Sequence, residues 1–111
     1  MESNIVIQGL AALAHEGRLA VFRALVRGGQ QGLAAGEIAR QLALPANTLS
    51  AQLAILSAAG LVNRQRDGRS IIYTARLDTL NQLVLHLIED CCEGRDEVCA
   101  PILDALQATR C

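Results

Sequence analysis

The apolar positions in the first third of the chain recur with the spacing of a helix. Residues 5–14 are almost wholly apolar and predict a short helix. Residues 16–27 repeat apolar side chains at helical intervals as far as Gly28 and Gly29, which predict the end of that helix. Residues 30–35 have no such period and predict a loop or a weak turn.

A second pair of helices follows, and it has the arrangement of a helix-turn-helix. Residues 36–42 predict a short helix, residues 43–45 a turn that contains Pro45, and residues 46–59 a further helix. The last of these carries a leucine stripe on one face and short polar side chains on the other. Two short helices joined by a tight turn, the second with a small polar face, are typical of a DNA-reading helix-turn-helix.

The pattern then changes to that of a hairpin and returns to that of a helix. Residues 61–66 and 69–75 predict two strands, and Asp67-Gly68 between them is a strong hairpin signal. Asp78 predicts the cap of a last helix that continues to about residue 92. A helix-turn-helix followed at once by an arginine-bearing hairpin predicts a winged helix. The expected fold is mainly α with a β-hairpin, in the order α-α-α-α-β-β-α.

The chain of 111 residues is long enough for one domain with one core. We expect residues 1–92 to form a winged-helix DNA-binding and dimerisation domain, and residues 93–111 to form a C-terminal tail. The first helix is more apolar than a small core needs, and the last helix carries an apolar stripe on one face. We therefore predict a homodimer that pairs through these two helices, although both could instead pack only on their own core.

Composition narrows the class of protein further. The only aromatic residues are Phe22 and Tyr73, so the core has to be built from Leu, Ala, Ile and Val. No apolar run approaches the roughly 20 residues that span a bilayer, and the N-terminus lacks the basic region of a signal peptide. We expect a cytoplasmic protein with no membrane partner, in which the four cysteines, all within residues 91–111, are reduced thiols.

The net charge of −1 conceals an uneven distribution. Residues 15–76 hold eight arginines against three acids, a balance of +5, whereas residues 77–111 hold seven acids against two arginines, a balance of −5. A basic body joined to an acidic C-terminal segment suits a protein whose body meets phosphate and whose C-terminal segment has another task.

The expected DNA contacts lie on the polar face of residues 46–59 and on the hairpin. Gln52 can pair with adenine through two hydrogen bonds, and so can Asn47 where it points inward. The hairpin arginines would meet phosphates or the minor groove. Each residue alone could belong to an ordinary solvated surface, and it is their order along the chain that favours DNA binding. The predicted contact residues are Asn47, Thr48, Ser50, Gln52, Arg64, Arg66 and Arg69.

The chain resembles the ArsR/SmtB family of metalloregulatory repressors in three stretches: LAALAHEGRLAVFRAL, GEIARQLALPANTLSAQLAILSAAGLV and RQRDGRSIIYTA. The resemblance covers residues 9–92 in order and without large gaps. It implies a homodimeric winged-helix repressor that leaves operator DNA when a metal or metalloid ion binds. It also implies that the predicted contact residues lie on the family's recognition helix and wing.

The usual metal sites of that family are missing from this chain. Many arsenic- or cadmium-sensing members carry a Cys-Val-Cys element where this chain has Ala34 and Gly36. Zinc-sensing members use Asp and His on the last helix; Asp78 is present, but Leu80 and Cys91 stand where the histidines belong. The family's common ligand residues therefore cannot be carried over.

The chain instead resembles a subset of members that sense arsenite through a vicinal cysteine pair and a third cysteine, here Cys91, Cys92 and Cys99. Trivalent arsenic is thiophilic and takes three thiolates, and soft ligands suit such an ion. On a straight helix Cys92 and Cys99 would be roughly 10 Å apart, too far to share one ion. We therefore expect a break near Gly94, with residues 93–98 folded back as a loop. The expected inducer is As(III), with Sb(III) or methylated As(III) as further candidates.

Other interpretations of these cysteines stay open. Zinc or cadmium would need a fourth ligand, which Cys111, His86 or Glu89 could supply. Oxidation could join Cys92 to Cys99, and a buried free cysteine is also a common small hydrophobe. An enzyme is not expected, because an arsenate reductase needs an oxyanion loop around its cysteine and the chain has none. A metal carrier is disfavoured by the hairpin and the polar helix face. We expect His15 to be a helix cap or a surface residue.

Overall fold

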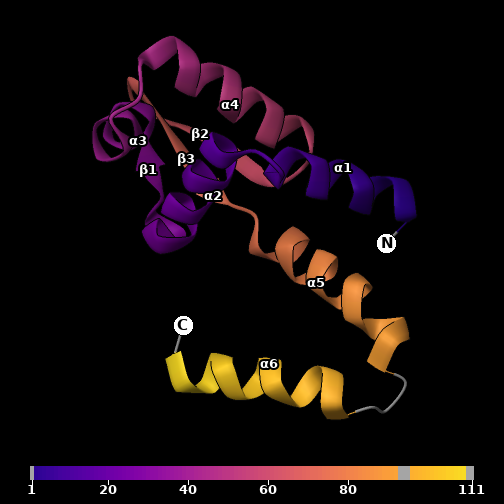
Figure 1. Ribbon diagram of the computed structural model, residues 1–111. Helices are drawn as coiled ribbons and strands as arrows, with labels where there is room; N and C mark the ends of the chain where they lie inside the picture. The colour runs from indigo at the N-terminus through magenta and orange to yellow at the C-terminus, as the bar shows by residue number, and fades with distance from the viewer. Residues whose placement is uncertain (1, 93–95, 110–111) are drawn as a thin grey trace.

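The structure is a computed structural model that describes the backbone of residues 2–92 and 96–109 and the side chains of residues 2–88 and 100–107. Figure 1 shows its elements in chain order. They contain the expected α-α-α-α-β-β-α series, which confirms the predicted winged-helix fold, and three further elements, η1, β1 and α6. Their bounds are α1 (Ser3–Leu13), α2 (Glu16–Gly28), the 3-10 helix η1 (Gly29–Gln31), β1 (Leu33–Ala34), α3 (Ala35–Leu42), α4 (Ala46–Ala58), β2 (Val62–Asp67), β3 (Ser70–Ala75), α5 (Leu77–Cys92) and α6 (Asp96–Thr109).

The junction of α1 and α2 is fixed by hydrogen bonds from two side chains. His15 Nδ1 accepts from the backbone N–H groups of Gly17 (3.1 Å) and Arg18 (3.3 Å), which otherwise have no partner at the start of α2. Arg18 Nε donates to the carbonyl oxygen of Ala12 (2.6 Å) at the end of α1. The expectation that His15 caps a helix is confirmed.

The two N-terminal helices are the part of the described chain that comes nearest to the length and hydropathy of a membrane-spanning segment. No single helix among the described residues is long and apolar enough to cross one. The segments Ser3–Leu13 and Glu16–Gln31 reach that length and hydropathy only together, and they are bent by 99° where they meet.

The helices α3 and α4 form the helix-turn-helix. α3 is capped at its C-terminus by Ala43, whose φ of 54° is left-handed, and the backbone N–H of Leu44 donates to the carbonyl of Ala39 (3.0 Å). Pro45 then separates the two helices, because the residue before a proline is driven out of the helical region. The predicted leucine stripe of α4 is buried; it consists of Leu49, Leu53 and Leu56.

The wing is the hairpin of β2 and β3. The strands pair antiparallel from Val62 opposite Ala75 to Asp67 opposite Ser70, around a two-residue loop. Gly68 opens this loop with a φ of 64°, a positive value that two-residue hairpin loops require. Both strands start one residue later than predicted, because Asp67 pairs with Ser70 and the loop consists of Gly68 and Arg69 rather than of Asp67 and Gly68.

A third strand, β1, lies on the other side of β3, with Leu33 opposite Tyr73 and Ala34 opposite Ile72. The prediction of a loop over residues 30–35 is therefore wrong at its end, because two residues are too few to show alternation. Gly32, directly before β1, has a φ of 70°, and a Cβ there would lie 2.5 Å from the carbonyl oxygen of Tyr73. Only glycine fits this close approach of η1 to β3.

Aliphatic side chains from the helices and the sheet form one core, as the composition predicts. Its fully buried members include Val21, Leu25, Ile38, Leu56 and Leu61. α5 joins this core through Leu83, which packs over α1 so closely that a Cβ at Gly9 would lie 3.1 Å from Leu83 Cδ1.

Beyond this anchor α5 leaves the core, and α6 turns back beneath it and contacts it (Figure 1). α5 ends at Cys92, as expected, and does not run on to Cys99. The expected loop over residues 93–98 is wrong in its second half, because α6 begins at Asp96. Gly94 lies outside the described residues. α6 contains Pro101, which the sequence analysis gave no reason to place inside a helix.

Candidate nucleic-acid interface

The polar face of α4 is open to solvent, as a recognition helix requires. Asn47, Thr48 and Ser50, three of the predicted contact residues, are exposed on it. Asn47 Oδ1 accepts a hydrogen bond from the backbone N–H of Thr48 (2.9 Å), which orients the amide at the start of the helix. The small side chains of Ala51 and Ala54 lie exposed between them and allow close approach to a groove.

Gln52 does not lie with these residues. It is 8% exposed and packs against α2, where a Cβ on Gly17 would overlap with Gln52 Nε2. Its Oε1 is buried with no hydrogen-bond partner among the described residues. The structure therefore separates Gln52 from the exposed face to which the sequence assigned it, because its position borders the leucine stripe as well as the polar face.

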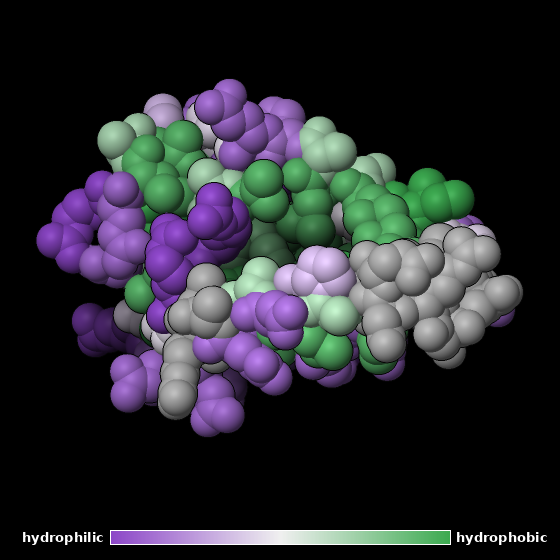
Figure 2. Space-filling model, turned by 60° about the horizontal axis from the view of Figure 1, so that its bottom comes forward, coloured by the Kyte–Doolittle hydropathy of each residue, from purple (hydrophilic) through white to green (hydrophobic). Residues whose placement is uncertain are grey.

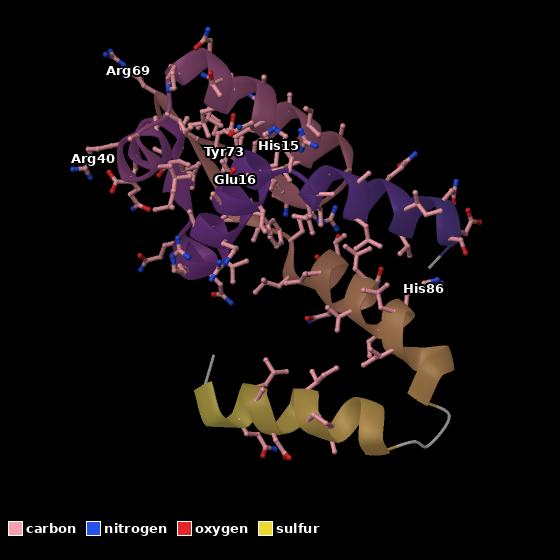
Figure 3. All side chains as sticks on the ribbon, in the orientation of Figure 1. His15, Glu16, Arg40, Arg69, Tyr73 and His86 are labelled. Atoms are coloured by element: carbon pink, nitrogen blue, oxygen red, sulfur yellow. The ribbon has the colours of Figure 1, made fainter. Side chains whose placement is uncertain are left out.

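The predicted wing residues Arg64, Arg66 and Arg69 are all exposed. Arg64 and Arg66 lie two residues apart on β2 and so point to the same face of the sheet. Arg69 is in the hairpin loop, at the end of the molecule from which Arg40 of α3 also projects (Figure 3). Within residues 2–88 and 100–107, no ion pair neutralises the three wing arginines. Their charge is available to phosphates.

Two other arginines are paired with acids. Arg40 donates to the carboxylate of Glu37 one helical turn earlier, and this hydrogen bond lowers the pKa of Glu37 and raises that of Arg40. Arg76 donates to Asp78 Oδ2 (3.1 Å) and lowers the pKa of Asp78. Asp78 itself lies in the first turn of α5 rather than at its cap, since the helix begins at Leu77.

The recognition helix and the wing meet at a hollow of about 240 Å³. Two predicted contact residues, Ser50 of α4 and Arg64 of β2, line it together. Ser57 and Tyr73 also line this hollow but were not among the predicted contact residues. Tyr73 is the direct cross-strand partner of Arg64. The remaining lining residues are Leu53 and Ala54.

The cysteines of the candidate metalloid site lie outside the described side chains. Their backbone positions are given by the helices: Cys91 and Cys92 are the last residues of α5, and Cys99 is in the first turn of α6. His86, weighed as a further ligand, is half-buried on α5 (Figure 3), and Glu89 and Cys111 are not among the described side chains. The described part of the chain contains no group of three His, Cys, Asp or Glu residues placed to hold a metal.

Known proteins with the same arrangement are transcriptional regulators. The model of a helix-turn-helix domain matches residues 13–65. The HTH-type transcriptional regulator YgaV of Escherichia coli (strain K12) is 33% identical over 78 residues, which cover 70% of this chain and 77% of YgaV. An ArsR-like transcriptional regulator from Rhodococcus sp. RHA1 is 26% identical with a TM-score of 0.70, over 92% of both chains.

A further similar structure is the homodimeric winged helix-turn-helix DNA-binding domain Mb0332 from Mycobacterium bovis, described as a possible ArsR-family regulator. It is 31% identical with a TM-score of 0.61, over 78% of this chain and 84% of that chain. The exposed recognition helix and the arginine-bearing wing define a winged-helix DNA-binding protein. The chain belongs to the ArsR family of helix-turn-helix transcriptional regulators, and its relatives are regulators rather than enzymes, as expected.

Proposed function

We propose that this regulator is a homodimeric repressor that leaves its operator when trivalent arsenic or antimony binds Cys91, Cys92 and Cys99. The proposal rests on one observation: Cys91 and Cys92 end one helix, α5, and Cys99 lies in the first turn of the next helix, α6. α5 ends at Cys92 and α6 begins at Asp96, and the two helices contact one another. A thiol pair and a third thiol therefore belong to the adjoining ends of two packed helices.

The donor set fits a soft ion and suits a hard one poorly. Three thiolates supply the three bonds that trivalent arsenic forms, whereas Mg²⁺ or Ca²⁺ would need oxygen ligands. A methylated arsenical offers fewer free valences and would engage only part of the set. Zinc or cadmium would require a fourth donor, and in the described part of the chain His86 belongs to no group of three or more His, Cys, Asp or Glu side chains placed to hold a metal.

The proposed dimer rests on apolar side chains that the protomer leaves in water. Ile7 of α1 is 64% exposed and Leu87 of α5 is 50% exposed, and further exposed residues on these helices are Ile5, Leu10, Leu77, Val84 and Leu85. Figure 2 shows a broad apolar area on the face that includes α5 and α6. A monomer rarely exposes so many large apolar side chains on adjoining helices, and a two-fold partner with the same face would cover them.

The same helices connect the cysteines to the DNA-reading part. α5 is anchored on α1 through Leu83 and Gly9, and α1 contacts both α2 and α4. Binding of the ion would draw the start of α6 to the end of α5 and change how α5 presents its exposed face to the partner. The two recognition helices of the dimer would then no longer match two half-sites one helical turn apart, and DNA affinity would fall.

Operator binding under reducing conditions tests the proposal. Fluorescence anisotropy of labelled operator DNA is titrated with As(III), Zn(II), Cd(II) and, without reductant, hydrogen peroxide. As(III) is expected to release wild-type protein and not the Cys99→Ser variant. Cys111→Ser removes the one cysteine outside the proposed site and should respond as the wild type does.

The outcomes separate the alternatives. Release by peroxide but not by As(III) would replace the proposal with thiol oxidation, and release by zinc or cadmium alone would replace it with a divalent-metal sensor. Operator affinity that saturating As(III) leaves unchanged contradicts the proposed regulation. For the dimer, sedimentation of Leu87→Glu should show monomers, whereas Leu19→Glu, which changes an exposed leucine of α2, should leave the assembly intact.

A further inference from the structure

The hollow between α4 and the wing has the shape of a small binding site. It is lined by residues of α4 and of the β2–β3 hairpin, and has a volume of about 240 Å³. One water takes roughly 30 Å³ in the liquid, so the hollow has room for a tetrahedral anion with water around it.

Its polar lining consists of hydrogen-bond donors with no acid among them. Arg64 contributes a guanidinium, which only donates, and Ser50, Ser57 and Tyr73 contribute hydroxyl groups. No side-chain hydrogen bond or ion pair joins these four groups to any other described residue. A set of free donors around one cation suits a ligand that is negatively charged and only accepts hydrogen bonds.

The backbone fixes the position of two of these donors. Arg64 and Tyr73 are directly opposite in the antiparallel ladder, so their side chains start from the same face of the sheet. Tyr73 is half-buried against the core, which holds its ring in place while its hydroxyl end is left for a polar partner. Ser50 and Ser57 are seven residues apart, two turns of α4, and so lie along one side of that helix.

We infer that this hollow binds a phosphate group, and that Ser57 and Tyr73 are DNA-contacting residues which hold a backbone phosphodiester between the recognition helix and the wing. The inference rests on the DNA binding of the proposed function and adds two residues and a ligand to it. A base edge is a poorer occupant, because it carries no net negative charge to pair with the Arg64 guanidinium, whereas a phosphodiester is an anion whose free oxygens accept hydrogen bonds. A clamp of this kind would set how deeply α4 enters the groove.

The test measures the affinity of Ser57→Ala and Tyr73→Phe for operator DNA and for a duplex of unrelated sequence across a range of salt concentrations. Each variant loses one neutral donor, so affinity is expected to fall about tenfold on both duplexes while the dependence on salt stays unchanged. Arg64→Gln loses a charge, and the slope of log affinity against log salt should fall by about 0.9. Ser57→Thr keeps the hydroxyl and should bind as the wild type does, and Ser3→Ala removes a serine remote from the hollow as the matched control.

A second measurement identifies the source of the phosphate. Inorganic phosphate is compared with chloride at equal ionic strength. If both salts act alike, the hollow takes only the DNA backbone; if phosphate competes better with DNA in the wild type and not in Tyr73→Phe, it also takes the free anion. Unchanged affinity in both Ser57→Ala and Tyr73→Phe, or a loss confined to the operator, overturns the inference. Failure of the wild type to bind either duplex would instead contradict the proposed function.

Discussion

Gln52 of the recognition helix and Gly17 of α2 are in direct contact. A Cβ added at Gly17 would overlap with the amide nitrogen of Gln52 and lie 3.2 Å from its Cδ. The contact lies in the first turn of α2, beside the imidazole of His15 that caps this helix. The absence of a side chain at position 17 therefore lets Gln52 lie inward between α2 and α4.

Gly17→Ala is expected to be less stable than Gly36→Ala by about 1 kcal/mol, the lower end of what overpacking costs, because the end of the Gln52 side chain can move aside. Both glycines are the second residue of a helix, and a Cβ at Gly36 meets nothing within 4 Å. Urea unfolding measures the difference. In a Gln52→Ala background the two alanine substitutions should have equal effects, and a difference that persists there would show that Gln52 is not the obstacle.

Gln52→Met should raise the free energy of unfolding by about 1 kcal/mol, since a buried carbonyl without a partner costs on the order of 1–3 kcal/mol and methionine has a similar length. Thermal unfolding checks this effect. The sequence-based role of Gln52 as an adenine reader predicts, in addition, weaker operator binding by the same variant. Unaltered stability would mean that Oε1 has a water partner.

Leu83→Ala is expected to cost about 2–5 kcal/mol of unfolding free energy, the range for buried leucines, because Leu83 is 2% exposed and holds α5 against α1. Leu19→Ala, at a leucine that is 42% exposed on α2, should change stability by less than about 0.5 kcal/mol. Chemical denaturation of both variants makes the comparison. Equal effects would show that α5 is not anchored at this position.

The ion pairs of Glu37 and Asp78 make a contribution to stability that acid removes. Arg40 lowers the folded-state pKa of Glu37, and Arg76 lowers that of Asp78, so each pair stabilises the fold above the ordinary carboxyl pKa and is lost as the pH falls through the lowered one. Arg40→Gln should therefore raise the pKa of Glu37 and leave that of Asp78 unchanged. Carboxyl NMR titration of the variant measures both values, and a shift of both would indicate a charge effect over longer range.

The elements that could be predicted from the sequence are those with a long periodic pattern of apolar residues or with a clear turn signal. The leucine stripe of α4 and the apolar stripe of α5 each repeat a signal over several residues, Asp67-Gly68 marks the hairpin of β2 and β3, and all of these elements exist. β1 is only two residues long and is formed through pairing with Tyr73 and Ile72, so no local pattern could reveal it. α6 has a signal in the sequence, acids in its first turn followed by apolar residues at helical spacing, which the predicted C-terminal tail did not take into account.

The candidate site was predictable where exposure follows from helical phase, as at Asn47, Thr48 and Ser50. Gln52 lies at the edge of the buried leucine stripe of α4. At that edge the helical phase alone does not determine whether a side chain faces the DNA bases or packs in the core. Tyr73 was given no role from the sequence, and its place beside Arg64 depends on the register of the hairpin. That register is fixed by the whole ladder, from Val62 opposite Ala75 to the loop, rather than by either residue.

Because Gly32 lies so close to Tyr73, a mutation at position 32 is expected to impair DNA binding although this glycine is outside the DNA-facing surface. Any side chain at position 32 would press on the carbonyl of Tyr73 and on the methyl groups of Ile72 and Thr74, and so would move the strand that carries the tyrosine. A selection for mutants that have lost DNA binding should therefore recover substitutions at Gly32. Such alleles would behave as DNA-binding defects, although the residue lies beneath the wing and touches no nucleotide.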